Sequence, residues 1–134
     1  MTKILLISHG NMAKGTLDTL RIFTAAENAE AISAYTDECQ HPEPLVKDFF
    51  DRAGNERVLA FSDIVFGSVN QLLLPYLERE NTYLFSGFNL PLLLQALALP
   101  EDASDDDIEA LTKEGKDGVI FMNTYQFASD AEDE

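Results

Sequence analysis

A histidine stands where the first apolar run of the sequence ends. The run KILLIS at residues 3–8 leads into His9 and Gly10, and the glycine allows the backbone to turn sharply there. A neutral imidazole keeps one nitrogen lone pair free, so it can act as a base or a nucleophile near pH 7. His9 is therefore the first candidate for function, whereas His41, in a polar stretch before Pro42, is interpreted as inert.

A carboxylate and a glycine-serine pair accompany a second apolar run. The run RVLAFSDI at residues 57–64 carries Asp63 near its end, and Gly67 and Ser68 open the helical pattern that follows. If Asp63 accepts a hydrogen bond from Nδ1–H of His9, it fixes the tautomer, frees Nε2 and stabilises positive charge on the ring. Backbone amides around Gly67 and Ser68, with the serine hydroxyl, could hold the oxygens of a phosphoryl group. Together these residues predict phosphorylation of the histidine on Nε2.

Other chemistries agree less well with these residues. Ser8 is adjacent to His9, but neighbouring strand residues point to opposite faces, and no G-x-S-x-G nucleophile elbow surrounds Ser68. A metal site would require three or more ligands, and only His9 and Asp63 are in place. GNMAKGT at residues 10–16 differs from a P-loop because its lysine precedes the second glycine, and no G-x-G-x-x-G is present. The sequence therefore predicts no metal and no cofactor.

Composition restricts the partners and the compartment. The chain has 134 residues, which suits one domain, and its formal net charge of −15 opposes binding to nucleic acid or anionic lipid. Cys39 is the one cysteine, so no internal disulfide can form, as is typical of a reducing cytosol. We find no secretory signal and no apolar run approaching about 20 residues. A cytoplasmic protein is expected.

Strand and helix patterns alternate along the sequence. Strands are predicted at 3–8, 29–35, 57–64 and 81–87. Helices are predicted at 11–24, 41–54, 67–79 and 89–97, and from 104 to 115. This alternation predicts an α/β fold, a doubly wound, flavodoxin-like sheet of four parallel strands in the order 2-1-3-4 with helices on both faces. Ligands of such sheets bind beyond the carboxyl ends of the first and third strands, where His9 and Asp63 should meet.

Local residue types refine these helices. Ser68 and Asn89 are expected to be N-caps, and Pro75 should kink the third helix because it lacks a backbone donor. Met12, Leu17, Leu20 and Phe23 are expected along the apolar face of the first helix. The last helix should begin with a capping box at 104–107 and end at the glycine at position 115.

Three motifs after the predicted strands resemble those of one known family. ISHG at 7–10, SDIVFGSVNQ at 62–71 and SGFNLPLLLQAL at 86–97 have the order and spacing of the enzyme IIA domains of the mannose-family sugar phosphotransferase system (PTS). Each motif is short, but the three together are specific. The resemblance extends over about residues 2–125.

The resemblance implies roles for individual residues. It implies that His9 is the phosphoryl acceptor, that Asp63 is its hydrogen-bond partner and that Ser68 contributes to the phosphate site. Many members have two glycines where this chain has Phe66 and Gly67, and Asn70 comes one residue earlier than in some members. These departures point to a subfamily.

The resemblance also implies a phosphorelay. His9 would take phosphate from the carrier protein HPr and pass it to the enzyme IIB component, and the membrane permease would complete sugar uptake. Related domains serve a dihydroxyacetone kinase relay or act as phosphorylation-sensing modules in regulators, and a flavodoxin-like module could instead bind flavin or nucleotide. These alternatives stay open, and the transported sugar is not encoded in this chain.

The C-terminal part of the sequence suggests an assembly. Members of the family can form homodimers in which a C-terminal strand pairs antiparallel with the partner's sheet. GVIFMNTYQF at 118–127 is apolar and β-rich, so it is expected either to be exchanged in this way or to form an edge strand of its own subunit. The IIA domain is expected over 1–127, with 128–134 as an acidic, disordered tail.

Overall fold

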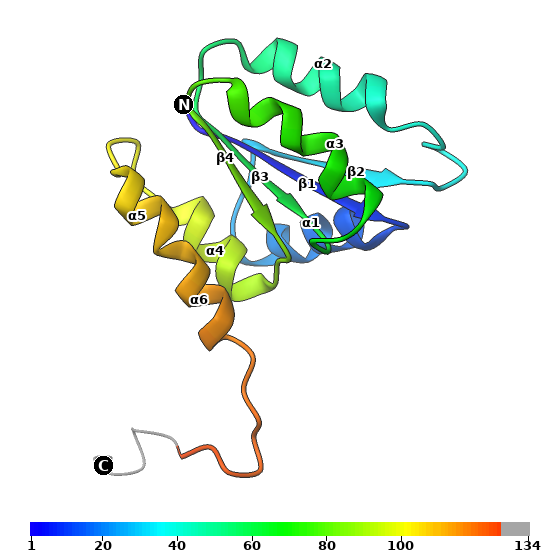
Figure 1. Ribbon diagram of the computed structural model, residues 1–134. Coiled ribbons are helices and arrows are strands. Elements are labelled where there is room, and N and C mark those ends of the chain that lie inside the picture. Colours follow the sequence, from blue (N-terminus) through cyan, green and yellow to red (C-terminus); the bar gives the residue numbers. More distant parts are fainter. Residues whose placement is uncertain (127–134) are drawn as a thin grey trace.

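A parallel sheet forms the centre of the molecule (Figure 1). The computed structural model describes residues 1–126. The strands are β1 Lys3–His9, β2 Ala29–Ala34, β3 Val58–Ser62 and β4 Thr82–Ser86. They lie in the order β2-β1-β3-β4 and every neighbouring pair is parallel, so the predicted doubly wound sheet is confirmed.

Helices cover both faces of this sheet (Figure 1). One side carries α1 Met12–Phe23, α4 Leu90–Ala98, α5 Asp105–Glu109 and α6 Leu111–Asp117. The other side carries α2 Glu43–Ala53, α3 Ser68–Leu73 and the 3₁₀ helix η1 Leu74–Glu78. None of the helices within residues 1–126 has the length and apolar character needed to cross a membrane.

The alternation of side chains along β1 determines which way its last residues point. Leu6 lies in the core beneath α1 and α4, and Ile7 lies in the core beneath α2 and α3. Because strand side chains alternate with a period of two, Ser8 follows Leu6 toward α1, and His9 follows Ile7 toward α3. The reactive ring and the buried serine are therefore separated by the sheet itself.

Helix starts and breaks agree with the sequence in part. Asn89 caps α4 by accepting a hydrogen bond from the Leu92 amide, as expected. At Pro75 the α-helix has already given way to η1, because the proline cannot donate the next backbone bond. The expected N-cap at Ser68 is wrong: Gly67 is the N-cap and Ser68 is the first helical residue.

The buried face of α1 agrees with the expected one at Leu17 and Leu20 but differs at its two ends. Met12 and Phe23 are 49% and 63% exposed. The buried residues are Ala13, Leu17 and Leu20, which are spaced four and three apart and form one stripe. Met12 and Phe23 lie beside that stripe, so the prediction that they belong to the apolar face was wrong for these two residues.

The last predicted helix is divided in two. Ser104 and Asp107 form the expected capping box at the start of α5. The chain bends at Ala110, and α6 then continues through Gly115 to Asp117. A Cβ at Gly115 would lie 3.3 Å from the Leu92 Cβ, so this glycine allows α6 to pack closely on α4 and does not end the helix.

The C-terminal segment forms no strand within the described chain. Residues 118–126 take no part in the sheet, so the interpretation of 118–127 as an edge strand of its own subunit is wrong for these residues. Exchange with a second subunit stays a prediction. Phe127 and the acidic tail at 128–134 lie outside the described residues.

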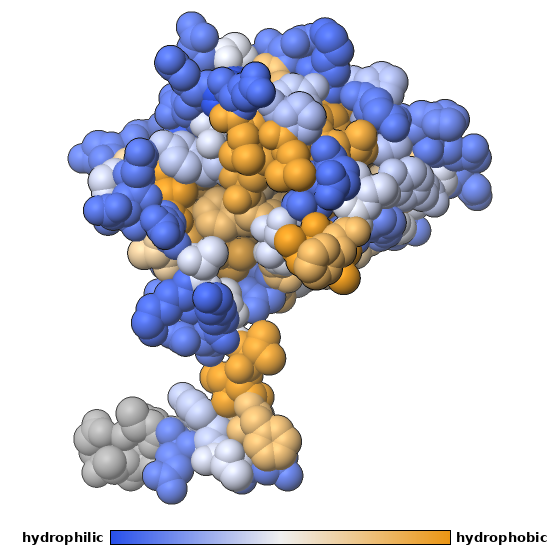
Figure 2. Space-filling view, in the orientation of Figure 1, coloured by the Kyte–Doolittle hydropathy of each residue, from blue (hydrophilic) through white to orange (hydrophobic). Residues whose placement is uncertain are grey.

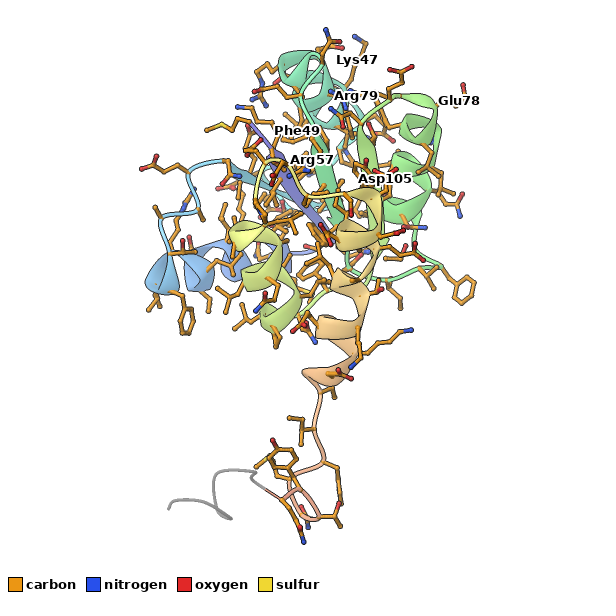
Figure 3. All side chains as sticks on the ribbon, turned by 90° about the vertical axis from the view of Figure 1, so that its left-hand side faces the viewer. Lys47, Phe49, Arg57, Glu78, Arg79 and Asp105 are labelled. Carbon is orange, nitrogen blue, oxygen red and sulfur yellow. The ribbon has the colours of Figure 1, made fainter. Side chains whose placement is uncertain are left out.

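Two arginines, Arg57 and Arg79, form hydrogen bonds at the amino ends of the strands, opposite His9. Both are labelled in Figure 3. Arg57 is buried, and its guanidinium donates to the Thr2 hydroxyl at 2.9 Å and to the Pro100 carbonyl at 3.0 Å. Arg79 donates to the Glu56 carbonyl at 2.8 Å. These bonds connect the amino ends of the strands to the surrounding loops, while the opposite end of the sheet is left for the site.

Candidate functional site

The carboxyl ends of β1 and β3 bring the predicted histidine and carboxylate into contact. Asp63 Oδ2 lies 2.9 Å from Nδ1 of His9 and also accepts a 2.9 Å hydrogen bond from the His9 backbone N–H. The His9 side chain is 42% exposed, whereas that of Asp63 is 12% exposed. An ionised carboxylate at Nδ1 requires the proton on that nitrogen, which leaves the lone pair on Nε2.

The pKa of Asp63 agrees with this assignment. Burial alone would raise the pKa of this carboxyl, but the hydrogen bonds from the backbone and ring of His9 outweigh burial and lower it below its ordinary value. Asp63 is therefore a fixed negative charge at neutral pH. Its second oxygen, Oδ1, is buried and has no hydrogen-bond partner among residues 1–126, so the charge is directed mainly at His9.

Ser8 and Gly10 shape the turn that presents His9. Gly10 has φ +67° and donates its N–H to the Ala34 carbonyl at 2.8 Å, which ties the turn to β2. The Ser8 hydroxyl donates to the Gly10 carbonyl at 3.0 Å and accepts from the Ala13 amide at 2.8 Å. Ser8 is fully buried and points away from His9, so it orders the start of α1 and is not placed to act as a nucleophile.

Asn70 fixes the loop that carries Asp63, a role that the sequence did not reveal. Its side chain is buried and donates to the Val65 carbonyl at 3.0 Å. Its oxygen accepts hydrogen bonds from the hydroxyls of Ser62, at 2.8 Å, and Ser86, at 2.5 Å. One amide thus joins the ends of β3 and β4 to the β3–α3 loop.

Gly67 and Ser68 lie against the His9 ring. A Cβ at Gly67 would be 2.7 Å from Cε1 of His9, so only a residue without a side chain allows this approach. The Ser68 hydroxyl oxygen is 3.4 Å from Nε2. Gly67 N–H donates back to the Ile64 carbonyl at 3.3 Å, and the amides of the first turn of α3 have no partner inside the helix. The structure therefore brings together all four residues that the sequence singled out.

Tyr35 also belongs to this constellation, and the sequence did not identify it. Its hydroxyl lies 2.9 Å from the Ser68 hydroxyl, and its ring centroid is 5.5 Å from that of His9. The residue follows β2, whose carboxyl end lies beside that of β1 in the predicted strand order. That order could have identified it, had the end of β2 been considered along with those of β1 and β3.

The other possible ligands and titratable groups add little to the site. Within residues 1–126, no group of three or more His, Cys, Asp or Glu side chains is arranged to hold a metal ion. His41 makes no hydrogen bond or ion pair in the described part of the chain. Among the described residues, His9 faces a carboxylate and His41 does not.

Most of the chain matches one family model. The family model EIIA-man, described as the PTS system fructose IIA component, matches residues 3–113. A search of curated proteins found no match.

Several solved structures share the fold. A candidate phosphoenolpyruvate-dependent sugar PTS permease from Klebsiella pneumoniae subsp. pneumoniae is 26% identical over 92% of both chains, with a TM-score of 0.81. The mannose/sorbose-specific IIA subunit from Enterococcus faecalis is 22% identical over 95% of this chain and 98% of its own, with a TM-score of 0.79. A PTS IIA protein associated with the fucose utilization operon of Streptococcus pneumoniae is 22% identical over 91% and 93%, with a TM-score of 0.77. At 22% identity the last two show a common fold alone.

Proposed function

The chain belongs to the EIIA-man family of sugar-PTS IIA components, and on that premise we propose that His9 carries a phosphoryl group between two other proteins. The proposed donor is phosphorylated HPr, and the proposed acceptor is the IIB component, which supplies the membrane permease. Such a relay operates in the cytoplasm. The observation that carries the proposal is the exposed His9 ring with its Nδ1 bound to Asp63 at 2.9 Å.

The first transfer uses the lone pair on Nε2 of His9. A new N–P bond forms at Nε2 as the N–P bond of the donor phosphohistidine breaks, and the electrons of that bond return to the donor imidazole. His9 keeps its Nδ1 proton, so its ring gains positive charge, which the Asp63 carboxylate stabilises. Transfer to IIB reverses these events. Because like bonds are made and broken, the protein needs mainly to position the reacting groups.

Ser68 and Gly67 suit the phosphoryl oxygens. The Ser68 hydroxyl lies within 3.4 Å of Nε2, close to the position that a phosphoryl group on that nitrogen would take. The amides of the first turn of α3, which have no partner inside the helix, could supply further donors for negatively charged oxygens. Gly67 leaves space beside the ring that a side chain would fill.

Labelling from phosphoenolpyruvate through purified enzyme I and HPr tests the proposal. His9→Ala should abolish incorporation of phosphate, because the variant lacks the accepting nitrogen. His41→Ala is the matched control and should be labelled like the wild type. Labelled His9→Ala would refute the assignment. Offering the phosphorylated chain to IIB and to a dihydroxyacetone kinase subunit then identifies the acceptor.

We propose in addition that the chain forms a homodimer by exchanging the segment that begins at Gly118. β4 is an edge strand of the sheet, and an apolar groove lined by Leu77, Tyr83 and Leu84 runs along it. In Figure 2 the segment that leads away from the body carries an orange, apolar surface. Its exposed apolar residues include Val119, Ile120, Phe121 and Met122. A strand from this segment would cover the open edge of the partner's β4 and bury both surfaces.

A further inference from the structure

We infer that Tyr35 is a positioning residue, which aims the Ser68 hydroxyl at the phosphoryl group carried by His9. The inference rests on the proposed function. Three contacts connect these residues: Tyr35 hydroxyl to Ser68 hydroxyl at 2.9 Å, Ser68 hydroxyl to Nε2 of His9 at 3.4 Å, and the two rings at 5.5 Å between centroids. Tyr35 thus reaches the reacting nitrogen through Ser68.

The backbone holds Tyr35 in an uncommon conformation. Its φ is +62°, in the left-handed region that bulky side chains rarely adopt. Tyr35 N–H donates to the Cys39 carbonyl at 2.7 Å, Thr36 N–H donates to the same oxygen at 3.2 Å, and Cys39 N–H donates to the Thr36 carbonyl at 3.0 Å. The Thr36 hydroxyl also donates to the Ser33 carbonyl at 2.8 Å. These bonds maintain a conformation that turns the ring off β2 and places it beside His9.

The protonation of His9 sets the direction of the hydrogen bonds. Nδ1–H of His9 donates to the Asp63 carboxylate, so neutral His9 has no proton on Nε2 and the Ser68 hydroxyl must donate toward that nitrogen. The oxygen of Ser68 then accepts from the Tyr35 hydroxyl. The result is a directed chain from Tyr35 through Ser68 to Nε2, in which each hydrogen bond polarises the next.

The directed chain prepares Ser68 for the transfer. At 3.4 Å the Ser68 hydroxyl is farther from Nε2 than in an ordinary hydrogen bond, and its proton already points to the side where the phosphoryl group arrives. Negative charge on the phosphoryl oxygens is stabilised most by donors that are oriented in advance. Without Tyr35, the Ser68 hydroxyl would rotate freely and would exchange bonds with water.

Tyr35→Phe removes the hydroxyl and keeps the ring, so it tests this role directly. The rate of His9 phosphorylation by phosphorylated HPr should fall about fivefold, as expected for the loss of one oriented hydrogen bond. The melting temperature should stay within error of the wild-type value. Tyr76→Phe is the matched control. The Tyr76 ring stacks on that of Phe50, with 4.0 Å between the ring centroids, and packs against the core beneath α2, so this variant should transfer phosphate at the wild-type rate.

A double-mutant cycle separates positioning from a merely structural role. If Tyr35 acts through Ser68, adding Tyr35→Phe to Ser68→Ala should slow transfer no further. The inference would be overturned if Tyr35→Phe transferred phosphate at the wild-type rate, or if it caused the full fivefold loss in the Ser68→Ala background. In either case, continued phosphorylation of His9 by HPr would leave the proposed function intact. Failure of HPr to phosphorylate the wild-type chain would overturn both.

Discussion

Two exposed apolar segments of this molecule differ in how the chain holds them. The β3–α3 loop exposes Ile64, Val65 and Phe66 beside His9. The C-terminal segment exposes Val119, Ile120, Phe121 and Met122. Asn70 fixes the loop by a bond to the Val65 carbonyl, whereas the C-terminal segment leads away from the body after α6 (Figure 1).

The difference separates two uses of apolar surface. The exposed residues 64–66 form a small apolar ridge on a fixed backbone. Such a ridge suits a partner that binds briefly and must leave, as a phosphate donor does. An apolar segment that departs from its own domain suits permanent burial, because its exposure alone would favour aggregation. We therefore expect the loop to govern transfer and the C-terminal segment to govern assembly.

The largest expected effect concerns assembly. Replacing Ile120→Asp together with Phe121→Asp should weaken dimerisation at least about a hundredfold, because neighbouring strand residues face opposite sides and one charge must enter the interface. Size-exclusion chromatography with light scattering should then give the mass of a monomer. The variant should still accept phosphate on His9, since these residues lie outside the site.

The control for this variant uses exposed apolar residues elsewhere. Ile22→Asp together with Phe23→Asp changes two exposed residues of α1 and should leave the mass unchanged. If the wild-type chain is monomeric at micromolar concentration, the proposal that the C-terminal segment governs assembly is wrong.

The next effect concerns the fixed backbone of the loop. Gly67→Ala should slow transfer about tenfold, because the added Cβ would lie 2.7 Å from Cε1 of His9 and 3.0 Å from Ile64 Cγ2. The ring must then move away from Ser68. Gly15→Ala is the control, because its Cβ would meet nothing within 4 Å. It should raise the free energy of unfolding by about 1 kcal/mol and leave the transfer rate unchanged. Equal transfer rates for the two variants would show that the close approach is unimportant.

A smaller effect concerns the ridge itself. Phe66 is 92% exposed, so Phe66→Ser should leave the unfolding free energy nearly unchanged. We expect a protein that delivers phosphate to His9 to dock on this exposed loop, so KM for phosphorylated HPr should rise about fivefold. Phe23→Ser, at an exposed position on α1, should not change KM. A fall in kcat with KM unchanged would contradict a docking role.

Much of the site could be predicted because topology alone brings its residues together. The apolar runs of β1 and β3 showed that two parallel strands end at His9 and Asp63, and neighbouring parallel strands end at the same edge. The alternation that buries Ser8 and presents His9 also follows from the sequence. These inferences need only strand identity and order, which long apolar runs indicate well.

The remainder depends on details that a pattern does not contain. Tyr35 reaches the site through a backbone with φ +62°, whereas the sequence pattern extended the strand through this residue and gave no sign of that conformation. Ser68 was expected as an N-cap because serine favours that position, but its hydroxyl bonds to Tyr35 instead. Asn70 is buried by the ends of two strands, a contact that its polar character does not suggest.

The smallest expected effect is a dependence of stability on pH. It should arise from the charge of Asp63 in the site and not from the apolar C-terminal segment. Although burial would raise the pKa of Asp63, hydrogen bonds from His9 hold it below the ordinary value of 3.8. As pH falls, the unfolded chain therefore takes up this proton before the folded chain does. Stability from the pair is complete above about pH 5 and is lost as pH falls through 3.8 toward the lower pKa of the folded state.

Asp63→Asn removes this contribution and keeps the shape of the side chain. The difference in unfolding free energy between wild type and variant, from urea titrations, should be constant down to about pH 5 and should shrink below about pH 4. Residues 119–122 contain no ionisable side chain, so the Ile120→Asp and Phe121→Asp background should show the same shrinkage. A difference that grows as pH falls would mean that the pKa of Asp63 is raised in the folded state, and that the hydrogen bonds from His9 do not outweigh the burial of this carboxyl.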